Sequence, residues 1–429
     1  MERSFFEKLI DWKDNSIRKP LIIEGARATG KTWIANEFGN RFFKDTVLLN
    51  FEKEASLHEL FQRTLNPKEI IAAIGALAEK SIDPRDTLII FDEVQEEPRA
   101  LSSLKYFCED APEYHIIATC SFTGIALRKG TSFPVGKVYM ETLYPLSFSE
   151  YLKIIGLTEL VKSIENKDHS FISPFKSTLN KHLKDYFLVG GMPKVVDTFL
   201  KSNDYNAARS VQVDILTEYQ KDFHERGKGP LENRLKQVWT SIPAQLSKSN
   251  RKFQYSQIVK GGRSQDYETA ILWLSDCGLV NRSHRITEPQ LPLRAYREFF
   301  VFKLFLNDIG LLGALSNVPL KTILTGNSIF NTLNGAMAEQ FVMQQLISEK
   351  NIEPFYYAPN GSRCKIDLVI QNDSSILPIE VMAEENLQAK SLRVFCRKFE
   401  LKGARLSMSD YRNDEWMTNY PLFAFAQWI

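Results

Sequence analysis

The first third of the chain alternates between short apolar runs and stretches with helical spacing. Residues 68–80 and 99–109 have the apolar positions of amphipathic helices. Strands that alternate with helices in this way form a parallel sheet flanked by helices, so we expect an α/β fold. The predicted strands are residues 21–24, 46–51, 87–91 and 115–119.

The middle of the chain has mainly helical periodicity. Residues 211–223 carry an apolar stripe at helical spacing, which predicts packing rather than chemistry. Residues 231–290 read as three helices followed by a wing, because Ser264 can cap the last helix and Gly278 follows its end. This order is typical of a winged helix.

Strand-like runs return near the end of the chain, where a helix containing Glu339 precedes them and residues 391–399 follow with helical spacing. We expect a small α/β domain there. Residues 156–180 are polar and rich in turn formers, which indicates a linker. The predicted domains are residues 1–155 with the parallel sheet, 156–230 with a linker and helical lid, 231–300 with the winged-helix-like part, and 301–429 with the small α/β end.

Composition narrows the class of protein. The chain has 429 residues, 44% of them hydrophobic, and a net charge of +2, so its overall charge gives no case for nucleic acid or membrane binding. Its five cysteines are scattered and lack C-x-x-C spacing, which argues against disulfides and zinc and favours a reducing cytoplasm. No apolar run approaches the ~20 residues that span a bilayer.

The loop after the first predicted strand carries the strongest chemical signal, because it matches the phosphate-binding pattern G-x-x-x-x-G-K-[ST]. Glycines allow the backbone to approach phosphate, the lysine neutralises the β- and γ-phosphates, and the threonine hydroxyl can bind Mg²⁺. We therefore expect a nucleoside triphosphate site. The loop consists of Gly25, Ala26, Arg27, Ala28, Thr29, Gly30, Lys31 and Thr32.

A second signal follows the third predicted strand, where Asp92 and Glu93 come directly after an apolar run. We expect Asp92 to hold Mg²⁺ and Glu93 to activate the attacking water. Thr119 and Ser121 end the fourth strand, where they are candidates for sensing the γ-phosphate; simple turn residues are the other interpretation.

The base is predicted to be adenine. GTP-binding proteins usually carry N-K-x-D, and residues 166–169 place the aspartate one position too early in a polar stretch. The expected ligands are therefore ATP and Mg²⁺.

Residues 19–32, 91–95, 131–138 and 143–151 resemble the prokaryotic AAA-type ATPases that are joined to a C-terminal domain of unknown function. The resemblance implies an additional-strand P-loop fold, ATP binding and ATP hydrolysis. Relatives often have Gly-Ser where this chain has Cys120 and Ser121. If that glycine is left-handed, we expect strain at Cys120 that alters the sensor region.

The C-terminal part resembles a restriction-endonuclease-like fold. Such sites use two acidic residues to hold Mg²⁺ and a lysine two positions after the second acid. Asp367 and Glu380 fill the acidic positions and Glu339 can join them, but Met382 stands where the lysine belongs. We expect a degenerate nuclease-like domain without nuclease activity.

The chain is thus predicted to be an AAA-type ATPase whose nucleotide state is coupled to binding of DNA or a protein partner. Lys31, Thr32, Asp92 and Glu93 would carry a slow, Mg²⁺-dependent hydrolysis. The alternatives are a nucleotide-controlled switch with negligible turnover and an ATP-gated, metal-dependent nuclease.

Partners are less well defined by the sequence. Basic residues surround the predicted winged helix, which suits DNA, whereas Asp266 and Glu268 on its last helix would repel phosphate. An arginine finger from a neighbouring subunit would imply a homo-oligomer, with Arg128, Lys129 and Lys221 as candidates. The basic residues are Arg251, Lys252, Lys260, Arg263, Arg282 and Arg285.

Overall fold

The computed structural model consists of two compact units. The first unit consists of Arg3–Tyr144 and Asp276–Gly278, and the second of Met1–Glu2, Pro145–Ser275 and Leu279–Ile429. The structure describes residues 1–121, 133–227, 229–248, 250–320, 334–359, 361, 364–382 and 389–429.

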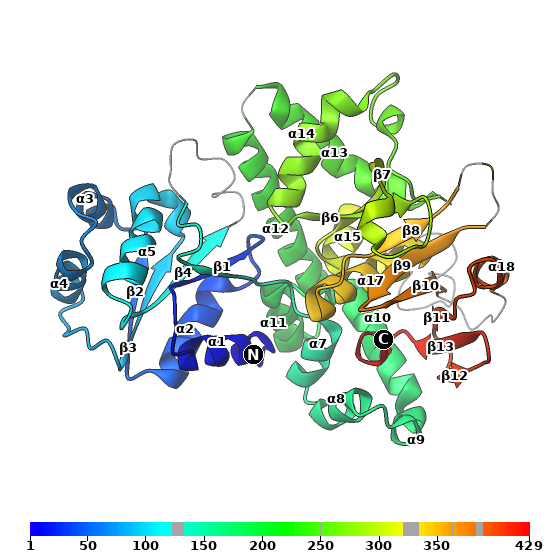
Figure 1. Ribbon diagram of the computed structural model, residues 1–429, viewed down its shortest axis with the longest axis horizontal. Coiled ribbons are helices and arrows are strands. Elements are labelled where there is room, and N and C mark those ends of the chain that lie inside the picture. The colour runs from blue at the N-terminus through cyan, green and yellow to red at the C-terminus, as the bar shows by residue number, and fades with distance from the viewer. Residues whose placement is uncertain are drawn as a thin grey trace. The chain divides into compact units, whose positions relative to one another are not determined.

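A parallel five-stranded sheet in the order β2-β3-β4-β1-β5 forms the centre of the first unit (Figure 1). The four strands predicted from the sequence are present, and β5 at the edge is an addition. The α/β prediction is therefore confirmed. The strands are β1 (Leu21–Gly25), β2 (Asp45–Asn50), β3 (Thr87–Asp92), β4 (His115–Ser121) and β5 (Tyr139–Thr142).

Helices cover both faces of this sheet because neighbouring strand residues point to opposite sides. Leu88 and Ile90 pack with the apolar residues of α1 and α2, whereas Ile89 and Phe91 pack with those of α3, α4 and α5. The helices are α1 (Phe5–Asp14), α2 (Lys31–Phe42), α3 (Ala55–Arg63), α4 (Pro67–Leu77) and α5 (Pro98–Asp110), with a short 3₁₀ helix η1 (Val94–Glu96).

The second unit begins with a helical part. Residues 156–180, expected as a linker, contain α8, α9 and the start of α10. In the described parts of the chain, every helix is too short or too polar to cross a bilayer. The helices are α7 (Phe148–Ile154), α8 (Thr158–Glu165), α9 (His169–Ile172), α10 (Lys176–Val189), α11 (Pro193–Ser202), α12 (Tyr205–Arg226), α13 (Pro230–Leu246), α14 (Ser264–Asp276), α15 (Ile309–Leu315), α17 (Asn334–Lys350), α18 (Lys390–Phe399) and α19 (Phe425–Trp428), with 3₁₀ turns η2 (Ser173–Phe175), η3 (Tyr255–Gln257) and η4 (Leu293–Tyr296).

A mixed eight-stranded sheet in the order β12-β13-β11-β10-β9-β8-β6-β7 lies in the second unit. Strand β6 lies where the wing was expected, its antiparallel partner β7 follows after residue 290, and β8 joins this pair to the C-terminal strands. The sheet thus crosses the predicted boundary after residue 300, and the four-part domain division stays a prediction. The strands are β6 (Val280–Ile286), β7 (Arg297–Leu306), β8 (Phe355–Tyr357), β9 (Ile366–Asn372), β10 (Ser375–Val381), β11 (Gly403–Ser407), β12 (Arg412–Asn413) and β13 (Met417–Pro421).

Candidate functional site

The predicted phosphate loop connects the end of β1 to the start of α2. Gly25 is required by packing, because a β-carbon there would collide with the carbonyl oxygen of Leu143. Gly30 is required by conformation, because its φ of 92° is left-handed. Ala28 is also left-handed, with a φ of 67°, so the loop holds a non-glycine residue in an unfavourable backbone region.

Lys31 lies at the base of this loop and is 5% exposed. Its Nζ donates hydrogen bonds to the carbonyl oxygens of Gly25, at 3.1 Å, and Ala26, at 3.0 Å. Burial lowers the pKa of Lys31, and the negative charges of Glu93 and Asp92 act in the opposite direction. The loop therefore positions one ammonium group beside the N-terminus of α2, where an anion is favoured by the backbone N–H groups.

Asp92, at the end of β3, is the centre of a hydrogen-bonded group. Its Oδ1 accepts from Thr32 Oγ1 at 2.7 Å and from Thr119 Oγ1 at 2.6 Å. Its Oδ2 accepts from Asn50 Nδ2 at 2.7 Å. The side chains come from α2, β4 and β2, and they meet because the carboxyl ends of parallel strands share one edge of the sheet.

Sequence reasoning missed Asn50 as part of this group. A signal for it exists, since Asn50 is a polar residue in a predicted strand and is in register with Asp92. The neighbour relation of β2 and β3, which brings the two residues together, could not be read from the sequence.

Glu93 has a left-handed backbone, with a φ of 54°. Its N–H donates to Thr119 Oγ1 at 3.2 Å, and its carboxylate accepts from Gln95 Nε2 at 2.5 Å. Gln95 Nε2 also donates to Ser121 Oγ at 3.2 Å. Gln95, which the sequence analysis did not select, thus connects Glu93 to the end of β4.

Cys120 does not have the left-handed backbone on which the expected strain depended. It lies within β4 and is in register with Glu24 of β1, so its backbone is extended. The residue is buried, and its neighbours Thr119 and Ser121 make the contacts described above. A left-handed backbone is therefore absent at Cys120, and the effect of this residue on the sensor region stays a prediction.

These residues fit a bound Mg²⁺–ATP. Mg²⁺ prefers oxygen ligands and is usually held in proteins by one or two carboxylates together with substrate phosphates. Thr32 and Asp92 place a hydroxyl and a carboxylate 2.7 Å apart, and the negative charge of Asp92 also acts on the buried Lys31 ammonium. The donor set is thus suited to a divalent cation that bridges protein and phosphate. Arg128 and Lys129 lie outside the described residues, and Lys221 is on α12 of the second unit.

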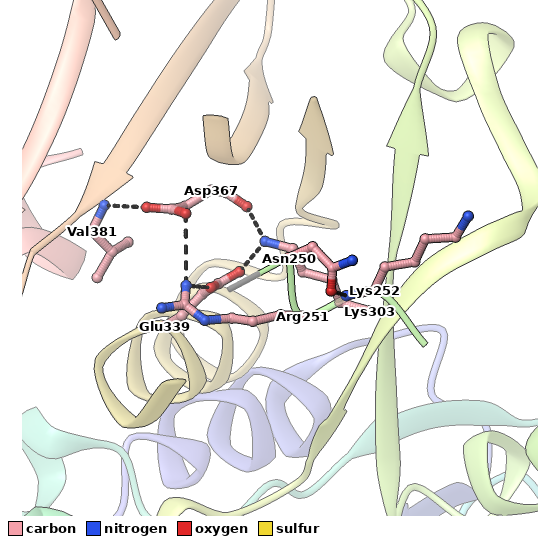
Figure 2. Close-up of polar contacts among 7 residues, drawn as sticks. All are labelled: Asn250, Arg251, Lys252, Lys303, Glu339, Asp367 and Val381. Carbon is pink, nitrogen blue, oxygen red and sulfur yellow. Dashed lines mark hydrogen bonds and ion pairs between the residues drawn. The ribbon is translucent and has the colours of Figure 1, made fainter. Parts of the chain in front are cut away.

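The predicted nuclease-like residues occupy adjacent elements of the second unit, as Figure 2 shows for Glu339 and Asp367. Glu339 on α17 and Asp367 on β9 both contact Arg251 Nη1, the latter at 3.6 Å. Lys303 Nζ contacts Glu339 Oε1 at 2.5 Å. Burial would raise the pKa of Glu339, but Lys303 and Arg251 hold it below its ordinary value.

Glu380, on β10, is in a different environment. Its Oε2 is buried without a hydrogen-bond partner, and burial together with the negative charge of Asp367 raises the pKa of Glu380 to about 7. Met382 follows β10 and donates its N–H to Leu406 O at 2.8 Å. Among the residues that the structure describes, no three His, Cys, Asp or Glu side chains are grouped so that they could hold a metal ion.

Sequence reasoning missed Arg251 and Lys303 as members of this second group. In the sequence, Arg251 is one of the basic residues around the predicted winged helix, and Lys303 belongs to no motif. Met382 stands where a nuclease-like site has its lysine, whereas the two cations that contact Glu339 come from distant segments.

Three family models match separate stretches of the chain. Residues 17–152 match an AAA domain, residues 180–322 a domain of unknown function (DUF8612), and residues 334–422 another domain of unknown function (DUF4143). No curated protein matches the chain.

Two solved structures illustrate the wider likeness. The chain is similar to the Walker-type ATPase PABY2304 of Pyrococcus abyssi, with 15% identity, a TM-score of 0.43, and coverage of 72% of this chain and 94% of that chain. It is also similar to Cdc6p from Pyrobaculum aerophilum, with 13% identity, a TM-score of 0.25, and coverage of 74% of this chain and 92% of that chain. At such TM-scores neither likeness bears on function. Residues 17–152 thus match an AAA domain and contain the parallel five-stranded sheet, so this part of the chain is similar to AAA domains in sequence and has an α/β fold.

Proposed function

We propose that the chain binds and slowly hydrolyses ATP in the presence of Mg²⁺, and that its nucleotide state is coupled to binding of DNA or a protein partner. The observation that carries this proposal is the group around Asp92, which joins Thr32 of the phosphate loop to Thr119 of β4. A purely structural loop has no need to place a threonine hydroxyl, a carboxylate and a buried ammonium at one edge of a sheet.

Each residue has a distinct part in the proposed reaction. Lys31 and the first N–H groups of α2 bind and orient the phosphates, and Thr32 and Asp92 hold the Mg²⁺ that neutralises charge on them. Glu93 accepts the proton of the attacking water. Catalysis of phosphoryl transfer is mainly positioning and electrostatics, so an arginine from a neighbouring subunit would accelerate it further.

Adenine is the proposed base. The nearest match to the guanine-specific pattern, residues 166–169, consists of the connection between α8 and α9 and the first residue of α9. There the Asp168 side chain caps α9 by accepting from Phe171 N at 3.1 Å. That aspartate therefore has a structural role, and it belongs to the second unit.

The test is to measure ATP affinity and turnover separately in wild type, Lys31→Ala and Glu93→Gln. We expect Lys31→Ala to weaken ATP binding by roughly 10–100-fold, because a charge-assisted contact to phosphate is lost. We expect Glu93→Gln to bind ATP normally and to lower turnover by about 10²-fold or more. Glu52→Gln, an exposed carboxylate just beyond β2, is the matched control.

The same measurements separate this proposal from a switch with negligible turnover. The switch has support in the hydrogen bond from Gln95 to Glu93, which engages the carboxylate that would activate water. Tight ATP binding with equal, near-zero turnover in wild type and Glu93→Gln would establish the switch. Equal affinity and turnover in all variants would reject both forms of the proposal.

The case for DNA as the partner is weakened by ion pairs in and around the winged-helix-like part. Three of the basic residues expected to contact phosphate are engaged in ion pairs within the chain: Arg251 with Glu339, Arg282 with Glu268 and Arg285 with Glu298. Arg285 makes contacts to both carboxylate oxygens of Glu298. These pairs reduce the positive charge available to a nucleic acid backbone.

A further inference from the structure

Four charged side chains from distant segments form a cluster in the second unit (Figure 2). Arg251 precedes η3, Lys303 is on β7, Glu339 is on α17 and Asp367 is on β9. The side chains of Glu339 and Lys303 are 0% and 5% exposed, and those of Arg251 and Asp367 are 18% and 28% exposed. The cluster is therefore buried at one end and reaches solvent at the other.

Every carboxylate oxygen in this cluster has a partner. Glu339 Oε2 contacts Arg251 Nη1, and Glu339 Oε1 accepts from Lys303 Nζ at 2.5 Å. Asp367 Oδ1 lies 3.6 Å from Arg251 Nη1, and Asp367 Oδ2 accepts from the N–H of Val381 at 3.0 Å. Lys303 Nζ also donates to the carbonyl oxygen of Asp367 at 3.1 Å. Two cations and two anions thus satisfy one another.

This arrangement does not fit the Mg²⁺ ion that a nuclease-like site would hold. Mg²⁺ requires oxygen lone pairs at about 2.0–2.1 Å in octahedral geometry, whereas those of Glu339 are directed at an ammonium and a guanidinium. A divalent ion placed there would also be repelled by both positive charges at short range.

We propose that Arg251 and Lys303 are built-in counterions that replace a divalent cation between Glu339 and Asp367. While these ion pairs are formed, Glu339 and Asp367 do not bind a metal ion. Arg251 at the same time ties the segment before η3 to α17 and β9. A buried carboxylate without such a partner would be strongly destabilising, so the counterions make the burial of Glu339 tolerable.

Two local features independently indicate that the position of the guanidinium is specified. The backbone of Arg251 is left-handed, with a φ of 46°, which is unfavourable for a residue with a long side chain. Gly335, in the first turn of α17, leaves the space that Arg251 Nη2 occupies, because a β-carbon there would collide with this nitrogen. Both features are explained if the ion pairs hold Arg251 in place.

The test is to count bound Mn²⁺ by electron paramagnetic resonance on the full chain without nucleotide. We expect wild type and Asp367→Asn to bind the same amount of Mn²⁺, because the acids are already neutralised. We expect Arg251→Ala to gain about one Mn²⁺ per chain, because the variant leaves two carboxylates with the single ammonium of Lys303 and removes the guanidinium from Glu339 Oε2 and Asp367 Oδ1. The double variant Arg251→Ala, Asp367→Asn should lose that ion again.

Two further variants distinguish the effect of the position of the Arg251 guanidinium from the effect of its positive charge. Gly335→Ala keeps every charged group but displaces the guanidinium, so we expect it to bind more Mn²⁺ than wild type. Arg251→Lys keeps a cation at the site and should bind no additional Mn²⁺.

Two outcomes would overturn the proposal. One is a Mn²⁺ ion bound to wild type and lost in Asp367→Asn, which would make this a metal site. The other is a folded Arg251→Ala that gains no Mn²⁺. If Arg251→Ala does not fold, the comparison of wild type with Asp367→Asn alone decides, because it leaves Arg251 intact.

Discussion

At the scale of single residues, similar acidic side chains have different environments because of what lies within a few ångströms. Asp92 accepts three side-chain hydrogen bonds, and Glu339 contacts two cations. Glu380 has a buried oxygen without a partner. The sequence showed that acids occur at these positions, but their partners come from segments far along the chain. The different environments of these acids therefore became visible only with their contacts in the structure.

Glu380 makes stability depend on pH near neutrality. Burial first, and then the negative charge of Asp367, raise the pKa of Glu380 to about 7, while Arg405 partly offsets them. A carboxyl group whose pKa is higher in the folded than in the unfolded state favours folding while it is protonated. Its contribution is therefore fully present below the unfolded pKa and is lost as the pH rises through about 7.

We expect Glu380→Gln to remove this dependence. Its free energy of unfolding should exceed that of wild type by on the order of 1–3 kcal/mol at about pH 8, and the difference should shrink toward about pH 5. Chemical denaturation across this pH range measures it. Asp373→Asn, at the exposed turn between β9 and β10, is the control and should follow wild type. A constant difference at all pH values would contradict the assignment.

At the scale of elements, apolar periodicity located most strands and helices, but it did not say which residues of an element face the core. Ile34 and Phe38 of α2 are buried, whereas the apolar Trp33 next to them in the sequence is 41% exposed.

Two glycines just before α11 are explained by their backbone conformation and packing. Gly190 is left-handed, with a φ of 74°, and Gly191 N–H donates to the buried Asp308 Oδ2 at 2.6 Å.

Gly191 should be far less tolerant of substitution than a glycine with open surroundings. A β-carbon on Gly191 would collide with the carbonyl oxygen of Leu146, which is backbone and already accepts from Tyr186 Oη at 2.5 Å. We expect Gly191→Ala to lower the free energy of unfolding by about 1–3 kcal/mol.

Gly313 in α15 is the matched control for this prediction. A β-carbon there would have its nearest neighbour at 3.7 Å, an ordinary contact, so Gly313→Ala should raise stability by up to about 1 kcal/mol through helix propensity. If Gly191→Ala and Gly313→Ala change the free energy of unfolding equally in a denaturation experiment, the close contact with Leu146 does not make Gly191 less tolerant of a β-carbon.

At the scale of the whole chain, the sequence predicted those features that short, local patterns encode. The phosphate loop depends on eight consecutive residues, and the parallel sheet on alternating strands and helices. The order β2-β3-β4-β1-β5 and the addition of β5 depend on contacts between distant segments. The same holds for the charged cluster, in which Arg251 and Glu339 are 88 positions apart and Lys303 and Asp367 are 64 apart.

The slow hydrolysis proposed for an isolated subunit has a consequence for assembly. If a neighbouring subunit supplies the arginine finger, turnover per subunit should rise with protein concentration, because the charge that stabilises the transition state arrives only on association. Steady-state ATP hydrolysis over a dilution series measures this. Turnover per subunit that is independent of concentration, in a chain that remains monomeric, would contradict a finger acting between subunits.

Mixing inactive variants tests the same idea more sharply. Arg128→Ala combined with Lys129→Ala removes two candidate fingers but leaves the phosphate loop intact, whereas Lys31→Ala weakens ATP binding but keeps the candidates. Each should be slow alone. If the finger acts between subunits, the mixture should regain activity, because the intact loop of one variant meets the intact finger of the other. Loss in the first variant without recovery on mixing would place the finger within its own subunit, and unchanged turnover would leave Lys221 as the candidate.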